Sequence, residues 1–273
     1  MKISLARNSG FCFGVKKALE EVEKIKNKYC VYILGQLIHN KQVINELKKK
    51  GIKIIDDVDS IGKGTVVISA HGIPDKLKKK IKEKNLKIID TTCPLVEKVH
   101  NITKELEKQG YNMIIFGDRE HTEVKGIAGN LNAPVIINNA SGISAFNKKY
   151  ALVSQTTQDQ EEFGRTAKEL RKRIKELKVM DTICSATKQR QNEAKKLAKK
   201  VDMMLVIGDF SSANTRRLEQ ICLKIVETRH IETASELKAG WFKGKAHIGI
   251  TAGASTPDWI IKGAIERIKN EFQ

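Results

Sequence analysis

The chain has 273 residues, of which 40% are hydrophobic and 30% are charged, with 19 Gly and only 4 Pro. This composition is typical of an ordered globular protein and argues against disorder, while the length allows two or three lobes. No apolar run approaches the roughly 20 residues that span a bilayer, and the first segment, MKISLARNSG, lacks the apolar core of a secretory signal, so we expect a cytoplasmic protein with no membrane partner.

The charge balance is strongly basic. Lysine and arginine number 50 against 32 acidic residues, which gives a formal net charge of +18. Much of the excess lies in runs at 47–53 and 76–84, which are typical of solvated helix faces. Aromatic residues that could stack on bases make up only 5%, so nucleic acid binding is a weak inference. A net positive charge would also steer small phosphorylated metabolites toward the protein, and charge alone does not choose between these partners.

The first third of the chain begins with a helical pattern after Cys12, where apolar residues recur at helical spacing from Val15 to Ile25. A strand-like run, VYILG, follows and ends at Gly35. After another helix-like stretch comes a second strand-like run, VVISAHG, at 66–72. This alternation of short apolar strands and helices predicts parallel βαβ units.

The second and third parts of the chain repeat one another. KIIDTTCPLVEKVHNITKELEKQGYNMIIFGD at 87–118 aligns without a gap on KVMDTICSATKQRQNEAKKLAKKVDMMLVIGD at 178–209. The shared residues include Asp90, Thr91, Cys93, Gly117 and Asp118, each with its counterpart 91 residues later. The first third follows more loosely, so we interpret the chain as three copies of one α/β unit.

Three cysteines hold equivalent places in this repeat. Cys12, Cys93 and Cys184 each lie where an apolar run gives way to a helical pattern, at separations of 81 and 91 residues. An odd total of 5 cysteines argues against a disulfide framework, and the lack of any CxxC makes zinc the poorer fit. Thiolates also hold iron–sulfur clusters, and three ligands to a 4Fe-4S cluster would leave one iron open. We expect the other two cysteines, Cys30 and Cys222, to be buried small hydrophobes.

The predicted fold is α/β, with three similar lobes that contain parallel sheets and form a pseudo-threefold trefoil around a central cluster. The lobes span approximately 1–92, 93–183 and 184–273, although the strand before each cysteine could belong to the neighbouring lobe. Parallel sheets bind ligands at the carboxyl ends of their strands.

Polar residues follow the predicted strands at equivalent places in the three units. They are His39, His121 and the Ser211–Asn214 run after one strand, and His71, Thr156 and Ser255 after the other. Taken singly, such histidines are usually structural, and Ser212, Asn214 and Ser255 are typical of helix caps or turns. Capping is compatible with anion binding, because helix N-termini attract phosphate. Glu123, beside His121, is a candidate proton donor.

Nine motifs together resemble the 4-hydroxy-3-methylbut-2-enyl diphosphate reductase family: GFCFGV, LIHN, SAHGIP, DTTCPLVEKVH, HTEVKG, SQTT, DTICSATKQRQ, SANTRRL and TAGASTPDWI. The resemblance runs nearly end to end. It implies an oxidoreductase that converts its allylic diphosphate to isopentenyl and dimethylallyl diphosphates, the last step of the methylerythritol phosphate route to isoprenoids. Electrons would come from a ferredoxin or flavodoxin.

The resemblance also implies roles for individual residues. Cys12, Cys93 and Cys184 would hold a 4Fe-4S cluster, with the substrate hydroxyl at the open iron. The implied diphosphate-binding residues are His39, His71, Ser212, Asn214 and Ser255, with His121 close to the same anion. Glu123, linked with Thr156, would deliver protons.

One position departs from the family pattern. Ala213 stands where many members carry a second serine, which puts one hydroxyl contact to the diphosphate in doubt. Either Ser211 or Ser212 could match the first serine of the family; Ser212 is favoured by the Asn and Arg-Leu that follow.

Two alternative functions remain open from the residues. A three-lobed 4Fe-4S dehydratase of the quinolinate synthase type would share the architecture, but the HTEVKG and TAGAS motifs favour the reductase. A basic iron–sulfur sensor that binds nucleic acid would explain the charge, yet the chain shows no recognisable binding module.

Overall fold

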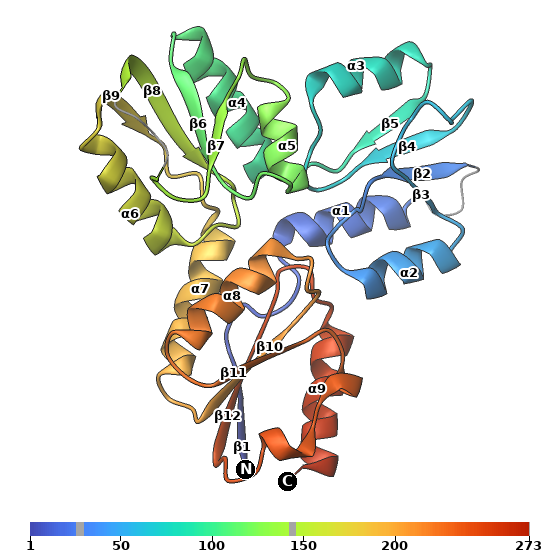
Figure 1. Ribbon diagram of the computed structural model, residues 1–273. Helices are drawn as coiled ribbons and strands as arrows, with labels where there is room; N and C mark the ends of the chain where they lie inside the picture. Colours follow the sequence, from blue (N-terminus) through green and yellow to red (C-terminus); the bar gives the residue numbers. More distant parts are fainter. Residues whose placement is uncertain (26–29, 142–145, 273) are drawn as a thin grey trace. The chain divides into compact units, whose positions relative to one another are not determined.

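The computed structural model describes residues 1–25, 30–141 and 146–272, which form three four-stranded sheets with helices around them (Figure 1). All strand pairs in the described residues are parallel. The chain divides into two compact units. Unit 1 comprises Met1–Val15, His39–Val43 and Ser185–Gln273, and unit 2 comprises Lys16–Ile38 and Ile44–Cys184.

Unit 1 contains one sheet in the order β1-β12-β10-β11. Its strands are β1 (Lys2–Leu5), β10 (Met203–Ile207), β11 (Thr228–Ile231) and β12 (His247–Ala252), and its helices are α7 (Ser185–Ala198), α8 (Ala213–Leu223) and α9 (Asp258–Glu271), with short 3₁₀ turns at Ala234–Glu236 and Ala239–Trp241. All five residues of β10 are buried. Alternate residues pack with α9 on one face and with α7 and α8 on the other, which explains the continuous apolar run.

Unit 2 contains the other two sheets, in the orders β3-β2-β4-β5 and β7-β6-β8-β9. The first has strands β2 (Val31–Leu34), β3 (Lys53–Ile55), β4 (Thr65–Ile68) and β5 (Lys87–Asp90), and helix α3 (Asp75–Glu83) belongs to the same stretch of chain. The second has β6 (Asn112–Phe116), β7 (Val135–Ile137), β8 (Phe146–Ser154) and β9 (Ile174–Val179), with α4 (Pro94–Lys108), α5 (Thr122–Ala128) and α6 (Gln160–Arg171). Two further helices, α1 (Phe13–Glu23) and α2 (Lys41–Lys49), each continue from a unit 1 segment into unit 2.

The strand before each cysteine has the same place in all three sheets. β1 pairs with β12, β5 with β4 and β9 with β8, so each lies beside a strand that ends in a polar loop. β1 therefore joins the sheet built from the C-terminal part of the chain (Figure 1). The residue bounds of the lobes and their trefoil arrangement stay predictions.

The predicted α/β class with three parallel sheets is confirmed. One expectation is wrong, because Cys30 is exposed rather than buried. It lies in the turn before β2 with a φ of 54°, and the buried strand begins one residue later, at Val31. Cys222 is buried as expected. No helix in the described ranges is long and apolar enough to cross a membrane.

Candidate functional site

The three repeated cysteines share one backbone geometry. Cys93 is the N-cap of α4, and Cys12 and Cys184 directly precede α1 and α7. Each donates its backbone N–H to a carbonyl two residues beyond the end of a neighbouring strand. The bonds run from Cys12 to Ala254 (3.1 Å), from Cys93 to Ala70 (3.0 Å) and from Cys184 to Thr156 (3.1 Å). The three cysteines are therefore equivalent in backbone structure as well as in sequence.

This placement fits thiolate ligands. A helix N-terminus stabilises negative charge, such as that of a thiolate. All three side chains are partly exposed. Cys222, by contrast, is buried, and burial raises the pKa of its thiol to about 12. The donor set thus suits an iron–sulfur cluster, and convergence of the three thiolates on one cluster stays a prediction.

Glu123 is a buried acid held by one residue. Its side chain lies in the first turn of α5 and is 1% exposed. Its carboxyl accepts the Thr156 backbone N–H at 2.6 Å and the Thr156 hydroxyl at 2.8 Å. Burial raises the pKa of Glu123 to about 7, although the two bonds from Thr156 oppose the shift. The carbonyl of the same Thr156 accepts the Cys184 N–H, so this one residue links the acid to a predicted cluster ligand.

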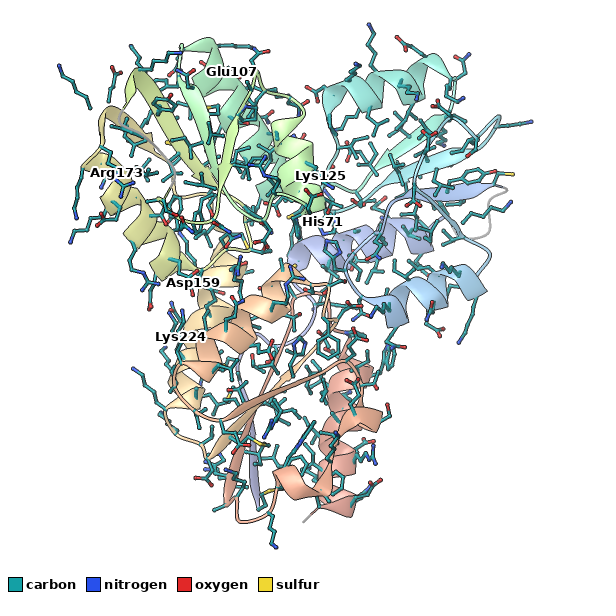
Figure 2. All side chains as sticks on the ribbon, in the orientation of Figure 1. His71, Glu107, Lys125, Asp159, Arg173 and Lys224 are labelled. Atoms are coloured by element: carbon teal, nitrogen blue, oxygen red, sulfur yellow. The ribbon has the colours of Figure 1, made fainter. Side chains whose placement is uncertain are left out.

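Two predicted histidines of unit 2 lie together. His121 is the N-cap of α5, and its Nδ1 accepts the Glu123 backbone N–H at 3.2 Å. His71, labelled in Figure 2, follows β4. The rings of His71 and His121 meet edge to face with centroids 5.5 Å apart. Unit 2 thus brings together Glu123, Thr156, His71 and His121, and their roles in a site stay predictions.

The remaining polar candidates lie in unit 1, around the start of α8. Ser212 is its N-cap and accepts the Thr215 N–H. Asn214 is 4% exposed, and its Nδ2 has no hydrogen-bond partner within the described residues. A buried amide donor without a partner is costly, so an anionic ligand at this helix N-terminus would satisfy it.

Ser211 and Ser212 make different hydrogen bonds. Ser211 donates its hydroxyl to Asp209 at 2.6 Å, whereas Ser212 caps the helix and lies 3.4 Å from the Ser255 hydroxyl. The choice of Ser212 as the diphosphate residue therefore fits its geometry. Ala213, at the first position of α8, is 3% exposed and offers only a methyl group there.

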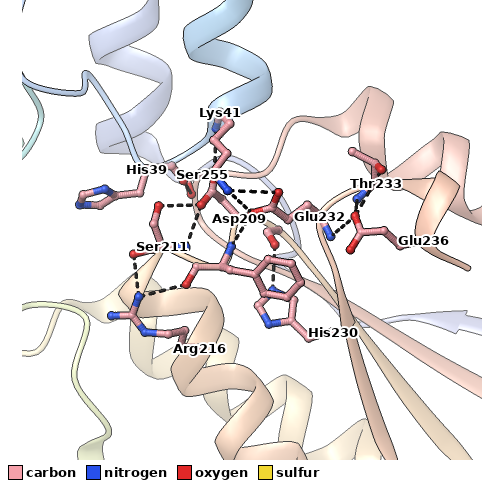
Figure 3. A network of polar contacts seen from close by, with 12 residues as sticks. His39, Lys41, Asp209, Ser211, Arg216, His230, Glu232, Thr233, Glu236 and Ser255 are labelled. Carbon is pink, nitrogen blue, oxygen red and sulfur yellow. Dashed lines mark hydrogen bonds and ion pairs between the residues drawn. The ribbon is translucent and has the colours of Figure 1, made fainter.

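His39 lies in a short segment of unit 1 that is hydrogen-bonded to the loops after β10 and β12 (Figure 3). Ser255 donates to the His39 carbonyl at 2.8 Å, and the Lys41 N–H donates to Asp209 at 2.7 Å. Burial would raise the pKa of Asp209, but the bonds from Ser211 and Lys41 outweigh it and hold that pKa below its ordinary value. For His39, burial lowers the pKa and outweighs the opposing charge of Asp209, which favours the neutral ring.

Removing the Asp209 carboxylate tests the role of this hydrogen bond in holding the His39 segment. Asp209→Ala should raise the KM for an anionic substrate, because the Lys41 N–H loses its acceptor and the His39 segment keeps only its bond from Ser255. The free energy of unfolding should fall by about 1–3 kcal/mol, the cost of leaving buried donors unsatisfied. Lys41→Met is the matched control: it keeps the backbone N–H and removes only an exposed ion pair with Glu232, so KM should not change.

The sequence did not assign roles to Asp209, Lys41, Glu232, His100 and Asn130. One signal was available for Asp209, which is the repeat counterpart of Asp118. The other contacts join segments far apart in the chain, such as Lys41 with Glu232, and no local pattern predicts them.

Known proteins are similar to this chain over nearly its whole length. A family model described as LytB protein matches residues 3–269. A 4-hydroxy-3-methylbut-2-enyl diphosphate reductase of Clostridioides difficile is 43% identical over 280 residues, covering 99% of this chain and 100% of that protein.

Two solved structures are also similar. The E-1-hydroxy-2-methyl-but-2-enyl-4-diphosphate reductase from Plasmodium falciparum matches with a TM-score of 0.94 at 29% identity, covering 99% of this chain and 88% of that one. A structure of (E)-4-hydroxy-3-methyl-but-2-enyl diphosphate reductase, the terminal enzyme of the non-mevalonate pathway, is 41% identical with a TM-score of 0.71, covering 98% and 99%. The full-length family match and the high identity show that the chain belongs to the LytB protein family.

Proposed function

We propose that this chain is a 4-hydroxy-3-methylbut-2-enyl diphosphate reductase, which forms isopentenyl and dimethylallyl diphosphates as the last step of its isoprenoid pathway. The observation that carries the proposal is the link from Glu123 through Thr156 to Cys184, because it places a buried acid beside a predicted cluster ligand. The chain's relatives carry the name of this reductase.

Reductases of this family use an iron–sulfur cluster. Here Cys12, Cys93 and Cys184 would hold one 4Fe-4S cluster with one iron open to substrate. The cluster, once bound, would supply electrons and Lewis acidity at the allylic hydroxyl. A ferredoxin or flavodoxin would deliver the electrons one at a time.

The diphosphate would be bound by polar side chains that follow the parallel strands. His39, His71, His121, Ser212, Asn214 and Ser255 are the proposed ligands. The N-terminus of α8 would supply donors to an anion, as would Asn214 Nδ2, which has no hydrogen-bond partner among the described residues. Hydrogen bonds to a charged acceptor are strong ones. The net charge of +18 would favour the approach of such a substrate.

Glu123 would supply the proton that allows the hydroxyl to leave as water. The balanced reaction consumes two electrons and two protons; one proton leaves in water and one ends on carbon. A pKa of about 7 leaves a large fraction of this carboxyl protonated at neutral pH. Thr156, which donates two hydrogen bonds to it, would fix its orientation.

The test is anaerobic reconstitution with iron and sulfide, followed by assay with the hydroxylated allylic diphosphate and a chemical reductant. We expect both product diphosphates, identified by mass spectrometry. Full cluster content with intact substrate would overturn the proposal. Formation of quinolinate from its precursors would instead support the dehydratase, and a salt-sensitive shift of DNA that does not depend on Glu123 would support the sensor.

A further inference from the structure

A buried histidine outside the predicted site joins the two halves of unit 2. His100 lies on the buried face of α4 and is 6% exposed. The Asn130 side-chain amide lies 2.9 Å from its Nδ1. Asn130 Oδ1 accepts the Asp75 backbone N–H at 2.7 Å, so the other amide atom, Nδ2, must be the donor to His100. The imidazole is therefore neutral and carries its proton on Nε2.

The imidazole ring of His100 packs against two glycines, Gly72 and Gly126. A Cβ built on Gly72 would lie 3.3 Å from His100 Nε2, and one built on Gly126 would lie 3.5 Å from Cε1 and 3.4 Å from the Gly72 carbonyl. Gly72 follows His71, and Gly126 lies one turn after Glu123 in α5. The ring thus packs against both the loop that carries His71 and the helix that carries Glu123, beside the point where their glycines meet.

Neighbouring contacts hold this junction together. Lys104 of α4 pairs with Asp75 at 2.9 Å, so the start of α3 is tied to α4 by charge and to Asn130 by a hydrogen bond. A cavity of about 100 Å³ adjoins the ring, lined in part by Thr92, Lys78 and Lys104. It has room for water, which could accept the buried Nε2–H that lacks a partner in the described part of the chain.

We propose that His100 is a positioning residue, which sets the spacing between the His71 loop and helix α5 through Asn130 and the two glycines. This proposal deepens the proposed function and rests on it for its kinetic consequences. The spacing governs the contact of His71 with His121, whose ring centroids are 5.5 Å apart. A displacement of about 1 Å from a distant mutation can lower a rate about 100-fold.

The kinetic test replaces the imidazole and then restores its acceptor. In reconstituted protein, His100→Leu should raise KM, because His71 moves, and should lower kcat, because Glu123 moves, with cluster content unchanged. The combined loss in kcat/KM should be about 10- to 100-fold. His100→Asn should recover most of it, since its Oδ1 can accept from Asn130. Asn130→Ala should act in the same direction as His100→Leu.

Thr103→Val is the matched control, because Thr103 is a fully buried residue on the same face of α4. Its hydroxyl donates to the His100 backbone carbonyl, so the substitution leaves the contacts of the imidazole ring in place. It should lower stability without changing KM or kcat. Wild-type kinetics in both His100→Leu and Asn130→Ala would overturn the proposal. If His100→Leu does not fold, His100→Asn and Asn130→Ala still decide it.

A second readout does not depend on turnover. The chain has 6 histidines, so histidine-selective isotope labelling gives few ring signals to assign by NMR. In the oxidised, cluster-loaded protein, the His71 and His121 signals should shift in His100→Leu and Asn130→Ala but not in Thr103→Val. Unshifted signals would contradict the positioning role. Absence of turnover in the wild type would count against the proposed function alone.

Discussion

Glu123→Gln should retain the cluster and lose most turnover. Glutamine keeps the size of the side chain and can still accept the Thr156 N–H, but it cannot donate a carboxylic proton. Loss of a general acid typically costs about 100- to 10,000-fold in rate, so we expect kcat to fall within that range. Iron and sulfide content, measured beside single-turnover kinetics, separates loss of the acid from loss of the cluster.

The raised pKa of Glu123 adds a pH dependence to this prediction. Because burial raises it from 4.5 to about 7, the protonated acid should disappear as pH rises through about 7, and wild-type kcat should fall with it. Glu123→Gln should lack this fall. Full activity of the variant, with the wild-type pH profile, would assign the proton to another group.

The stability of Glu123→Gln at high pH should change in the opposite direction to its turnover. A carboxyl whose folded pKa exceeds its unfolded value favours folding at low pH, and that contribution is lost as pH rises from about 4.5 to 7. The shift corresponds to about 3 kcal/mol. At pH 8, Glu123→Gln should therefore be more stable than the wild type by an amount of that order, measured by denaturant unfolding. Thr166→Val, at a buried residue of α6, is a control without an ionisable group.

Replacing any one of the repeated cysteines should remove the cluster. Cys12→Ser, Cys93→Ser and Cys184→Ser each take one thiolate from a proposed set of three, so iron should fall from about four atoms per chain to near zero. Turnover should be lost with it, while the fold, which each cysteine supports through its backbone N–H, should be retained.

The other two cysteines are the controls. Cys30→Ser changes an exposed side chain and should leave iron content and stability as they are. Cys222→Ser places a hydroxyl in the core between α7 and α8, so it should lower stability but not iron per folded chain. Iron loss on changing Cys30 or Cys222 and iron retention on changing Cys93 would contradict the assignment.

The repeat made much of the architecture predictable. Its threonines have a structural reason, since Thr91 donates its hydroxyl to the Ile68 carbonyl and Thr182 donates to Ser154 in the same way. Its strands were predictable because both faces are covered, which leaves runs such as Met203–Ile207 apolar throughout. The short strands β3 and β7, with three residues each, carry too little periodicity to predict.

The contacts that hold the site were not predictable from local pattern. Asp209 accepts from Lys41, 168 residues away, and Asn130 joins Asp75 to His100 across 55 and 30 residues. The exposure of Cys30 depends on a turn with positive φ, which an apolar run next to it does not indicate. Such features arise from tertiary packing, so the motifs predict candidate site residues but not the contacts that support them.

The most direct test of the account is Mössbauer spectroscopy of ⁵⁷Fe-reconstituted wild-type protein with and without the allylic diphosphate. Three thiolate ligands on one 4Fe-4S cluster predict that a quarter of the iron differs from the rest and that this fraction alone changes when substrate is added. Four equivalent iron sites that do not respond to substrate would contradict a shared ligand set of Cys12, Cys93 and Cys184.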